Sequence, residues 1–70
     1  MRQHEIDRKL NKYFRTHYGW NDEQKRILSL LFIYQEKRWI KKMEQLMDEA
    51  EKNGITPERL GEVLYEMNPI

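Results

Sequence analysis

The sequence predicts an all-α domain spanning residues 1–70, with three helices, a long central helix and a helical hairpin at its C-terminal end. Three observations lead to this. Residues 21–53 contain neither glycine nor proline. Apolar residues recur at spacings of three and four, the period of a helix that buries one face. No segment alternates apolar and polar residues in the way a strand does.

The first helix is predicted at about residues 4–17. Its buried face is formed by residues at helical spacing, namely Ile6, Leu10, Tyr13, Phe14 and His17. Gly19 then provides a residue that readily takes the left-handed conformation found after helix ends.

The central helix is predicted at about residues 22–52. Asn21 is a suitable N-cap, and Gln24, three residues on, completes a capping box. At 1.5 Å per residue such a helix would be about 46 Å long. A compact domain of 70 residues is only about 28 Å across. The helix must therefore either bend or project and be covered by a partner.

The central helix also carries two apolar faces. The longer face contains Leu28, Phe32, Trp39, Ile40, Met43, Leu46, Met47 and Ala50. The second face, nearly opposite, contains Ile27, Leu30, Leu31 and Tyr34. Because the first helix can cover only one face, the pattern predicts self-association or a partner protein. The alternative is a bend that lets the flanking helices cover both faces.

The third helix is predicted at about residues 57–67, after a turn at Asn53-Gly54. Thr56 is the expected N-cap and Pro57 the first helical residue. Ile55 and Leu60 occupy the two positions of a hydrophobic staple. The apolar residues of this helix are expected to fold back on the central helix, namely Leu60, Val63, Leu64 and Met67.

The charges divide the chain into a basic and an acidic part. Residues 1–42 contain eleven Lys or Arg and five Asp or Glu, a net charge of +6, and residues 43–70 have a net charge of −5. Such a division indicates either an acidic partner for the first part or attraction between the two parts, within or between chains.

Composition limits the location and the kinds of site. There is no cysteine, which excludes disulfides and thiolate zinc sites. The first ten residues lack the apolar core of a signal peptide. The longest apolar run, Leu30–Tyr34, is far too short to cross a bilayer. We therefore expect a soluble cytoplasmic protein without a membrane partner.

The C-terminal hairpin resembles a known family. The residues concerned are Leu46-Met47-Asp48-Glu49-Ala50, then Asn53-Gly54-Ile55-Thr56-Pro57-Glu58, then Leu60 and Leu64. This pattern, within about residues 43–67, is similar to the dimerisation hairpin of the Sin repressor and antirepressor. The resemblance implies helical dimerisation and partner exchange, with Leu46, Ala50, Ile55, Leu60 and Leu64 as apolar contacts. The family's tryptophan before the Leu-Met pair is replaced by Met43.

No group of residues predicts catalysis, a cofactor, a metal or a small-molecule substrate. His4 and His17 are too far apart on one helix to share a metal. Ser29 lies among leucines in mid-helix, without a base beside it in the sequence. The acids of the third helix, Glu58, Glu62 and Glu66, recur every four residues and predict a solvated ridge or a surface that meets basic residues.

Basic residues provide an alternative function, the binding of a nucleic acid by the first two helices. The residues for this alternative are Arg8, Lys12, Lys37, Arg38, Lys41 and Lys42. Three points weigh against it. Trp39 and Ile40 belong to the apolar stripe and are expected in the core, the net charge is near neutral, and the acidic ridge would repel phosphate.

The sequence thus predicts a small non-enzymatic regulatory protein that acts through helix-mediated protein–protein binding, in the manner of an antirepressor or inhibitor, and that forms a homodimer. The predicted partner-binding residues are Ile27, Leu30, Leu31, Tyr34, Leu46, Ala50, Ile55, Leu60 and Leu64.

Overall fold

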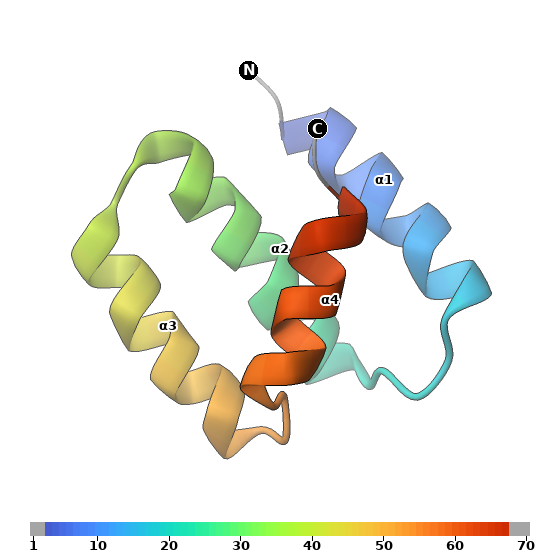
Figure 1. The fold of residues 1–70 in the computed structure, drawn as a ribbon. Helices are drawn as coiled ribbons and strands as arrows, with labels where there is room; N and C mark the ends of the chain where they lie inside the picture. The colour runs from blue at the N-terminus through green and yellow to red at the C-terminus, as the bar shows by residue number, and fades with distance from the viewer. Residues whose placement is uncertain (1–2, 68–70) are drawn as a thin grey trace.

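The computed structural model describes residues 3–67, and this part of the chain folds into four α-helices. They are α1 (Gln3–Thr16), α2 (Asp22–Lys37), α3 (Ile40–Lys52) and α4 (Pro57–Met67). Helices α2 and α3 form an antiparallel hairpin, α1 lies on the other side of α2 from α3, and α4 crosses in front (Figure 1). The all-α prediction is confirmed, but the prediction of three helices is wrong.

The prediction of one continuous central helix over residues 22–52 is wrong, because two helices cover this range. Helix α2 ends at Lys37, and Arg38 adopts the left-handed conformation with φ 58° and ψ 37°. The amide of Trp39 donates to the carbonyl of Tyr34 at 3.0 Å, and the amide of Arg38 donates to the carbonyl of Gln35 at 3.2 Å. These two bonds define a Schellman motif, a common way to end a helix.

An aromatic contact accounts for the break, although the left-handed position holds arginine instead of glycine. The rings of Tyr34 and Trp39 have centroids 5.6 Å apart. These residues occupy the two positions whose apolar contact commonly accompanies a Schellman motif. That contact offsets a left-handed arginine, a conformation that costs roughly 1–2 kcal/mol.

The break makes the fold compact. The molecule measures 30 × 29 × 20 Å, whereas the unbroken helix would be about 46 Å long. The hairpin is closed at its other end by the buried Gln24, whose amide nitrogen donates to the carbonyl of Asn53 at 2.8 Å. The sequence left open an alternative in which a bend allows both apolar faces to be covered, and the structure takes that form.

The other helix ends agree closely with prediction. Asn21 and Gln24 form the complete capping box at the start of α2. The hydroxyl of Thr56 accepts the amide of Arg59 at 3.1 Å and so caps α4. Gly19 and Gly54 both have positive φ, 94° and 84°. Gly54 closes α3 with a second Schellman motif, in which the amide of Ile55 donates to the carbonyl of Ala50 at 2.9 Å.

One core joins all four helices, and the second apolar face of α2 lies largely within it. Ile27 is 0% exposed and Leu31 2%, while Leu30 and Tyr34 are half-buried. The argument for a dimer based on this face no longer applies, because α2 is already covered within the chain. The buried apolar residues are Ile6, Leu10, Trp20, Ile27, Leu28, Leu31, Phe32, Leu46, Ala50, Ile55, Leu60, Val63 and Met67.

Candidate binding surface

The break between α2 and α3 creates an exposed corner that combines apolar and basic side chains. Trp39 is 44% exposed and Ile40 62%, although the sequence predicted both in the core. They are turned outward because the Schellman motif reverses the chain just before them. We call this surface the corner patch. It consists of Lys37, Arg38, Trp39, Ile40, Lys41 and Lys42, all exposed.

Cations are held close to the aromatic rings of the corner. The Lys37 ammonium lies 4.8 Å from the centre of the Trp39 ring. The Lys42 ammonium lies 5.8 Å from that ring and 5.9 Å from the Tyr34 ring. These distances are within the range of cation–π attraction. The corner is therefore partly ordered before any partner arrives.

The start of α3 adds to the positive charge. Trp39 occupies the N-cap position without a side-chain hydrogen bond, and the first turn of α3 holds no acid. Lys41 and Lys42 lie in that turn, where the helix dipole disfavours cations. By contrast, α2 begins with a capping box and with Asp22 and Glu23 in its first turn. An acidic group from a partner would supply the negative charge that this helix end lacks.

An apolar edge extends from the corner along α3. Leu46 and Ala50 are the buried residues of α3, so they mark the side of this helix that packs on the core. Met47 is displaced from Leu46 by about 100° around the helix, and Ile40 lies within about 20° of Met47. Met47 is 46% exposed, and Met43 between them is half-buried. Ile40 and Met47 thus share an exposed edge of α3, and Met43 lies between this edge and the core.

Most of the predicted partner-binding residues cannot serve as a surface in this fold. Six of the nine are buried in the core, namely Ile27, Leu31, Leu46, Ala50, Ile55 and Leu60. Three are half-buried, namely Leu30, Tyr34 and Leu64. The sequence pattern identified apolar helix faces correctly, but it could not show that these faces are buried against each other within a single chain.

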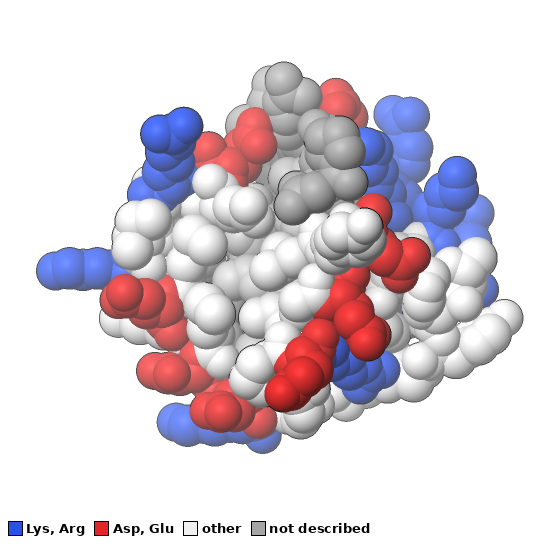
Figure 2. Space-filling model, viewed as in Figure 1, with Lys and Arg blue, Asp and Glu red and all other residues white. Residues whose placement is uncertain are grey.

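The predicted nucleic-acid-binding residues do not form one surface on the face shown in Figure 2. Lys37, Arg38, Lys41 and Lys42 meet at the corner patch. Arg8 and Lys12 instead line a hollow on α1. Basic side chains over α1 and over the α2–α3 corner lie on opposite sides of the view, and the acids of α4 run between them (Figure 2).

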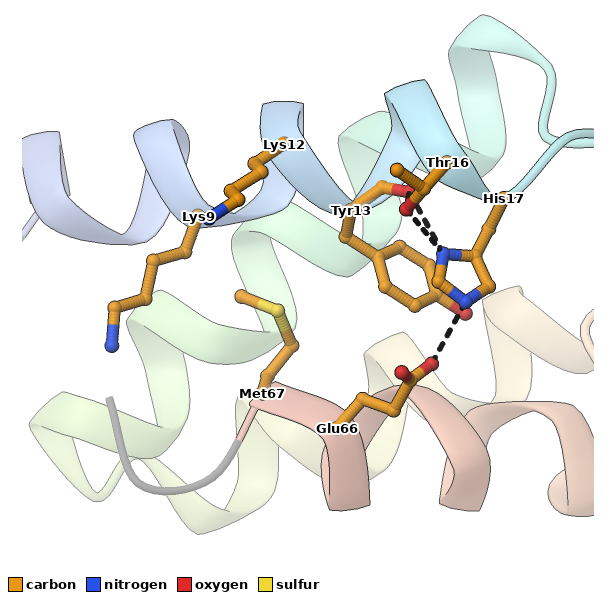
Figure 3. Close-up of a pocket in the computed structure, with 7 residues that line it drawn as sticks. All are labelled: Lys9, Lys12, Tyr13, Thr16, His17, Glu66 and Met67. Atoms are coloured by element: carbon orange, nitrogen blue, oxygen red, sulfur yellow. Dashed lines mark hydrogen bonds and ion pairs between the residues drawn. The ribbon is translucent and has the colours of Figure 1, made fainter.

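A second hollow, of about 320 Å³, lies between α1 and α4 (Figure 3). His17 stacks on Tyr13 with ring centres 4.0 Å apart, and its Nε2 lies 3.0 Å from the Glu66 carboxylate. Its Nδ1 lies 3.0 Å from the Tyr13 carbonyl. Burial, and next the charges of Glu66 and Glu62, raise the pKa of the Tyr13 hydroxyl. With contacts at both ring nitrogens, His17 joins the end of α1 to α4.

The remaining candidates for chemistry have structural partners. The Ser29 hydroxyl donates to Asp7 at 3.1 Å, without a histidine to activate it. Arg26 binds both Glu23 and Glu49, and its hydrogen bond lowers the pKa of the Glu23 carboxyl. Within residues 3–67, no three His, Asp or Glu side chains are grouped to hold a metal ion. None of the helices described is long and apolar enough to span a membrane.

Comparisons with protein-family models, with curated proteins and with solved structures gave no match to this chain. The resemblance to the Sin hairpin therefore depends on the residues of the α3–α4 segment alone.

Proposed function

We propose that this protein is a small non-enzymatic regulator that binds another protein through the corner patch and the adjoining edge of α3. The observation that carries the proposal is the exposure of Trp39 and Ile40 beside four cations, with the exposed Met47 about 10 Å further along α3. Large apolar side chains gathered on the surface of a small domain are typical of contact sites. Tryptophan and arginine are the residues most often found at the energetic centre of protein interfaces.

The charge of the patch defines the partner's surface. The apolar centre requires an apolar area on the partner, and the surrounding lysines and Arg38 require acidic residues around it. An acidic helix or turn with a few exposed apolar residues fits both conditions. The cations would govern the rate of encounter and the orientation, while Trp39 and Ile40 would supply most of the affinity. By binding there, the protein would compete for the partner's own helical contact, which is the mode of action that the Sin resemblance implies.

Photo-crosslinking in cells that produce the protein tests the proposal. A photoreactive amino acid replaces Ile40 in one variant and Tyr18, which is 85% exposed on the α1–α2 loop, in a control. We expect one protein adduct from position 40 that is absent from position 18. The identified protein and the purified chain should then bind each other, and Ile40→Asp should weaken that binding by at least about thirtyfold. Tyr18→Asp should leave it unchanged.

Two outcomes would refute the proposal. One is an adduct at position 40 that is a nucleic acid. The other is equal loss of binding in the Ile40→Asp and Tyr18→Asp variants, provided that both retain their helical circular dichroism.

Nucleic-acid binding remains the second candidate, favoured by the exposed Trp39 ring with lysines on either side. Bases of a single strand stack on such rings while lysines contact phosphates. Protein binding is preferred because Ile40 and Met47 gain nothing from phosphate and the ridge of α4 repels it. Replacing Lys37, Arg38, Lys41 and Lys42 with Gln should reduce the affinity for a single-stranded oligonucleotide and flatten its salt dependence if this candidate is correct.

A further inference from the structure

An acidic ridge on α4 has the features that the corner patch requires. Glu58, Glu62 and Glu66 recur every four residues, and all three are exposed. Tyr65 is 83% exposed and lies about 60° from Glu62 around the helix. The acids run along α4 on the face shown in Figure 2. The surface therefore combines negative charge with an exposed aromatic ring.

Positive charge within the chain is found near one end of the ridge, where Lys9, Lys12 and His17 line a hollow together with Glu66. Within the described residues, neither Glu58 nor Glu62 has an ion-pair partner, and Glu66 is paired with His17. The one cation of α4, Arg59, contacts Trp20 and Gly19. Its guanidinium lies 3.8 Å from the centre of the Trp20 ring and donates to the carbonyl of Gly19 at 3.2 Å. Acids spaced four apart repel each other, so a basic surface laid on the ridge would relieve that repulsion.

We infer that the corner patch of one copy binds the acidic ridge of α4 in a second copy. Lys37, Lys41 and Lys42 would face the glutamates, and Trp39 would lie against Tyr65. Glu58 and Glu66 are about 12 Å apart along the helix, so the ridge offers several acids to one corner. This inference rests on the proposed function, because it names the partner that the corner patch takes.

The two surfaces are different, so the contact is head-to-tail. After two chains pair, one chain keeps an unused ridge and the other keeps an unused corner. Contacts of this type extend into rings or open chains instead of stopping at a symmetric dimer. The mass in solution should therefore rise steadily with concentration. It should fall when ionic strength increases from about 0.01 M to about 0.15 M, because the screening distance shrinks from about 30 Å to about 8 Å.

Complementary variants test this arrangement by sedimentation equilibrium at low salt. The corner variant carries Lys37→Gln, Lys41→Gln and Lys42→Gln, and keeps Arg38 so that the turn is unaltered. The ridge variant carries Glu58→Gln and Glu62→Gln, and keeps Glu66 with its His17 contact. Each variant alone should associate at least about tenfold more weakly than the unaltered chain. An equimolar mixture should form one-to-one dimers and nothing larger, because it contains a single intact corner–ridge pair.

The inference is overturned if the unaltered chain stays monomeric up to about 1 mM, a concentration that reveals even weak contacts. It is also overturned if the mixture associates no more than the separate variants, or if either variant associates as strongly as the unaltered chain. A monomer that still yields a protein adduct at position 40 would overturn this inference and leave the proposed function standing. A nucleic-acid adduct there would overturn the proposed function itself.

Discussion

The guanidinium of Arg26 lies 3.1 Å from the carboxylate of Glu49, although 23 residues separate them in the chain. In one continuous helix those residues would be about 35 Å apart. Their contact exists because the chain reverses at Arg38 and α3 returns along α2. The same reversal buries the second face of α2 and exposes Trp39 and Ile40. Both the stability and the proposed binding surface of this protein therefore depend on that turn.

Substitution of Arg38 distinguishes a left-handed turn from a helix interior. Arg38→Gly should raise the melting temperature, since glycine adopts φ 58° without strain and arginine at such a position costs roughly 1–2 kcal/mol. Arg38→Val should lower it, because a β-branched residue is strongly disfavoured there. Thermal denaturation followed by circular dichroism measures both. In a continuous helix, Arg38→Gly would instead be less stable than the unaltered chain by about 1 kcal/mol.

The two tryptophans should differ in their access to solvent. Trp20 is 9% exposed and Trp39 44%. In a Trp20→Phe variant the remaining fluorescence should be red-shifted and readily quenched by acrylamide, and in Trp39→Phe it should be blue-shifted and protected. Equal protection of both tryptophans would show that the corner is covered.

Helix α4 should be held by Leu60, which is 6% exposed. Leu60→Ala should lower the free energy of unfolding by about 2–5 kcal/mol through lost burial and the cavity left behind. Thr56→Ala removes only the cap and should cost about 1 kcal/mol. Urea denaturation measures both. A Leu60→Ala variant as stable as the unaltered chain would contradict the packing of α4 on the core.

Stability should fall at alkaline pH because of Tyr13. Burial and the nearby acids raise the pKa of this tyrosine in the folded state above its ordinary 10.0. Its contribution is therefore complete below pH 10.0 and is lost as the pH rises through the folded-state pKa. Tyr13→Phe should reduce the loss of stability above pH 10.0, as measured by urea denaturation across that range. Tyr18→Phe is the control, and an identical pH profile for the two variants would disprove the role of Tyr13.

How far the sequence predicts the fold is clear from its two Schellman motifs. Gly54 follows Asn53 at the end of α3, and this glycine made the turn predictable. Arg38 holds the same position after α2 without such a signal. In a continuous helix the four cations of the corner would cover a sector of about 140°, with Trp39 and Ile40 opposite. The amphipathic pattern was therefore equally compatible with an unbroken helix.

For the same reason, only part of the candidate site could be predicted from the sequence. The basic residues Lys37, Arg38, Lys41 and Lys42 were identified from the sequence, but Trp39 and Ile40 were assigned to the core. The contact between Tyr34 and Trp39 favours a turn at Arg38. That contact is local, yet its effect on the turn depends on burying Ile27 and Leu31 elsewhere, which no local pattern reveals.

One distance tests the reversal at Arg38 most directly. The chain has no cysteine, so Arg26→Cys with Glu49→Cys places two spin labels uniquely, and dilution with unlabelled protein removes distances between chains. Because the two side chains touch in the hairpin, electron paramagnetic resonance should show strong dipolar coupling between the two labels. A distance near 35 Å, the length of a continuous helix between these positions, would contradict the hairpin, and the exposed corner with it.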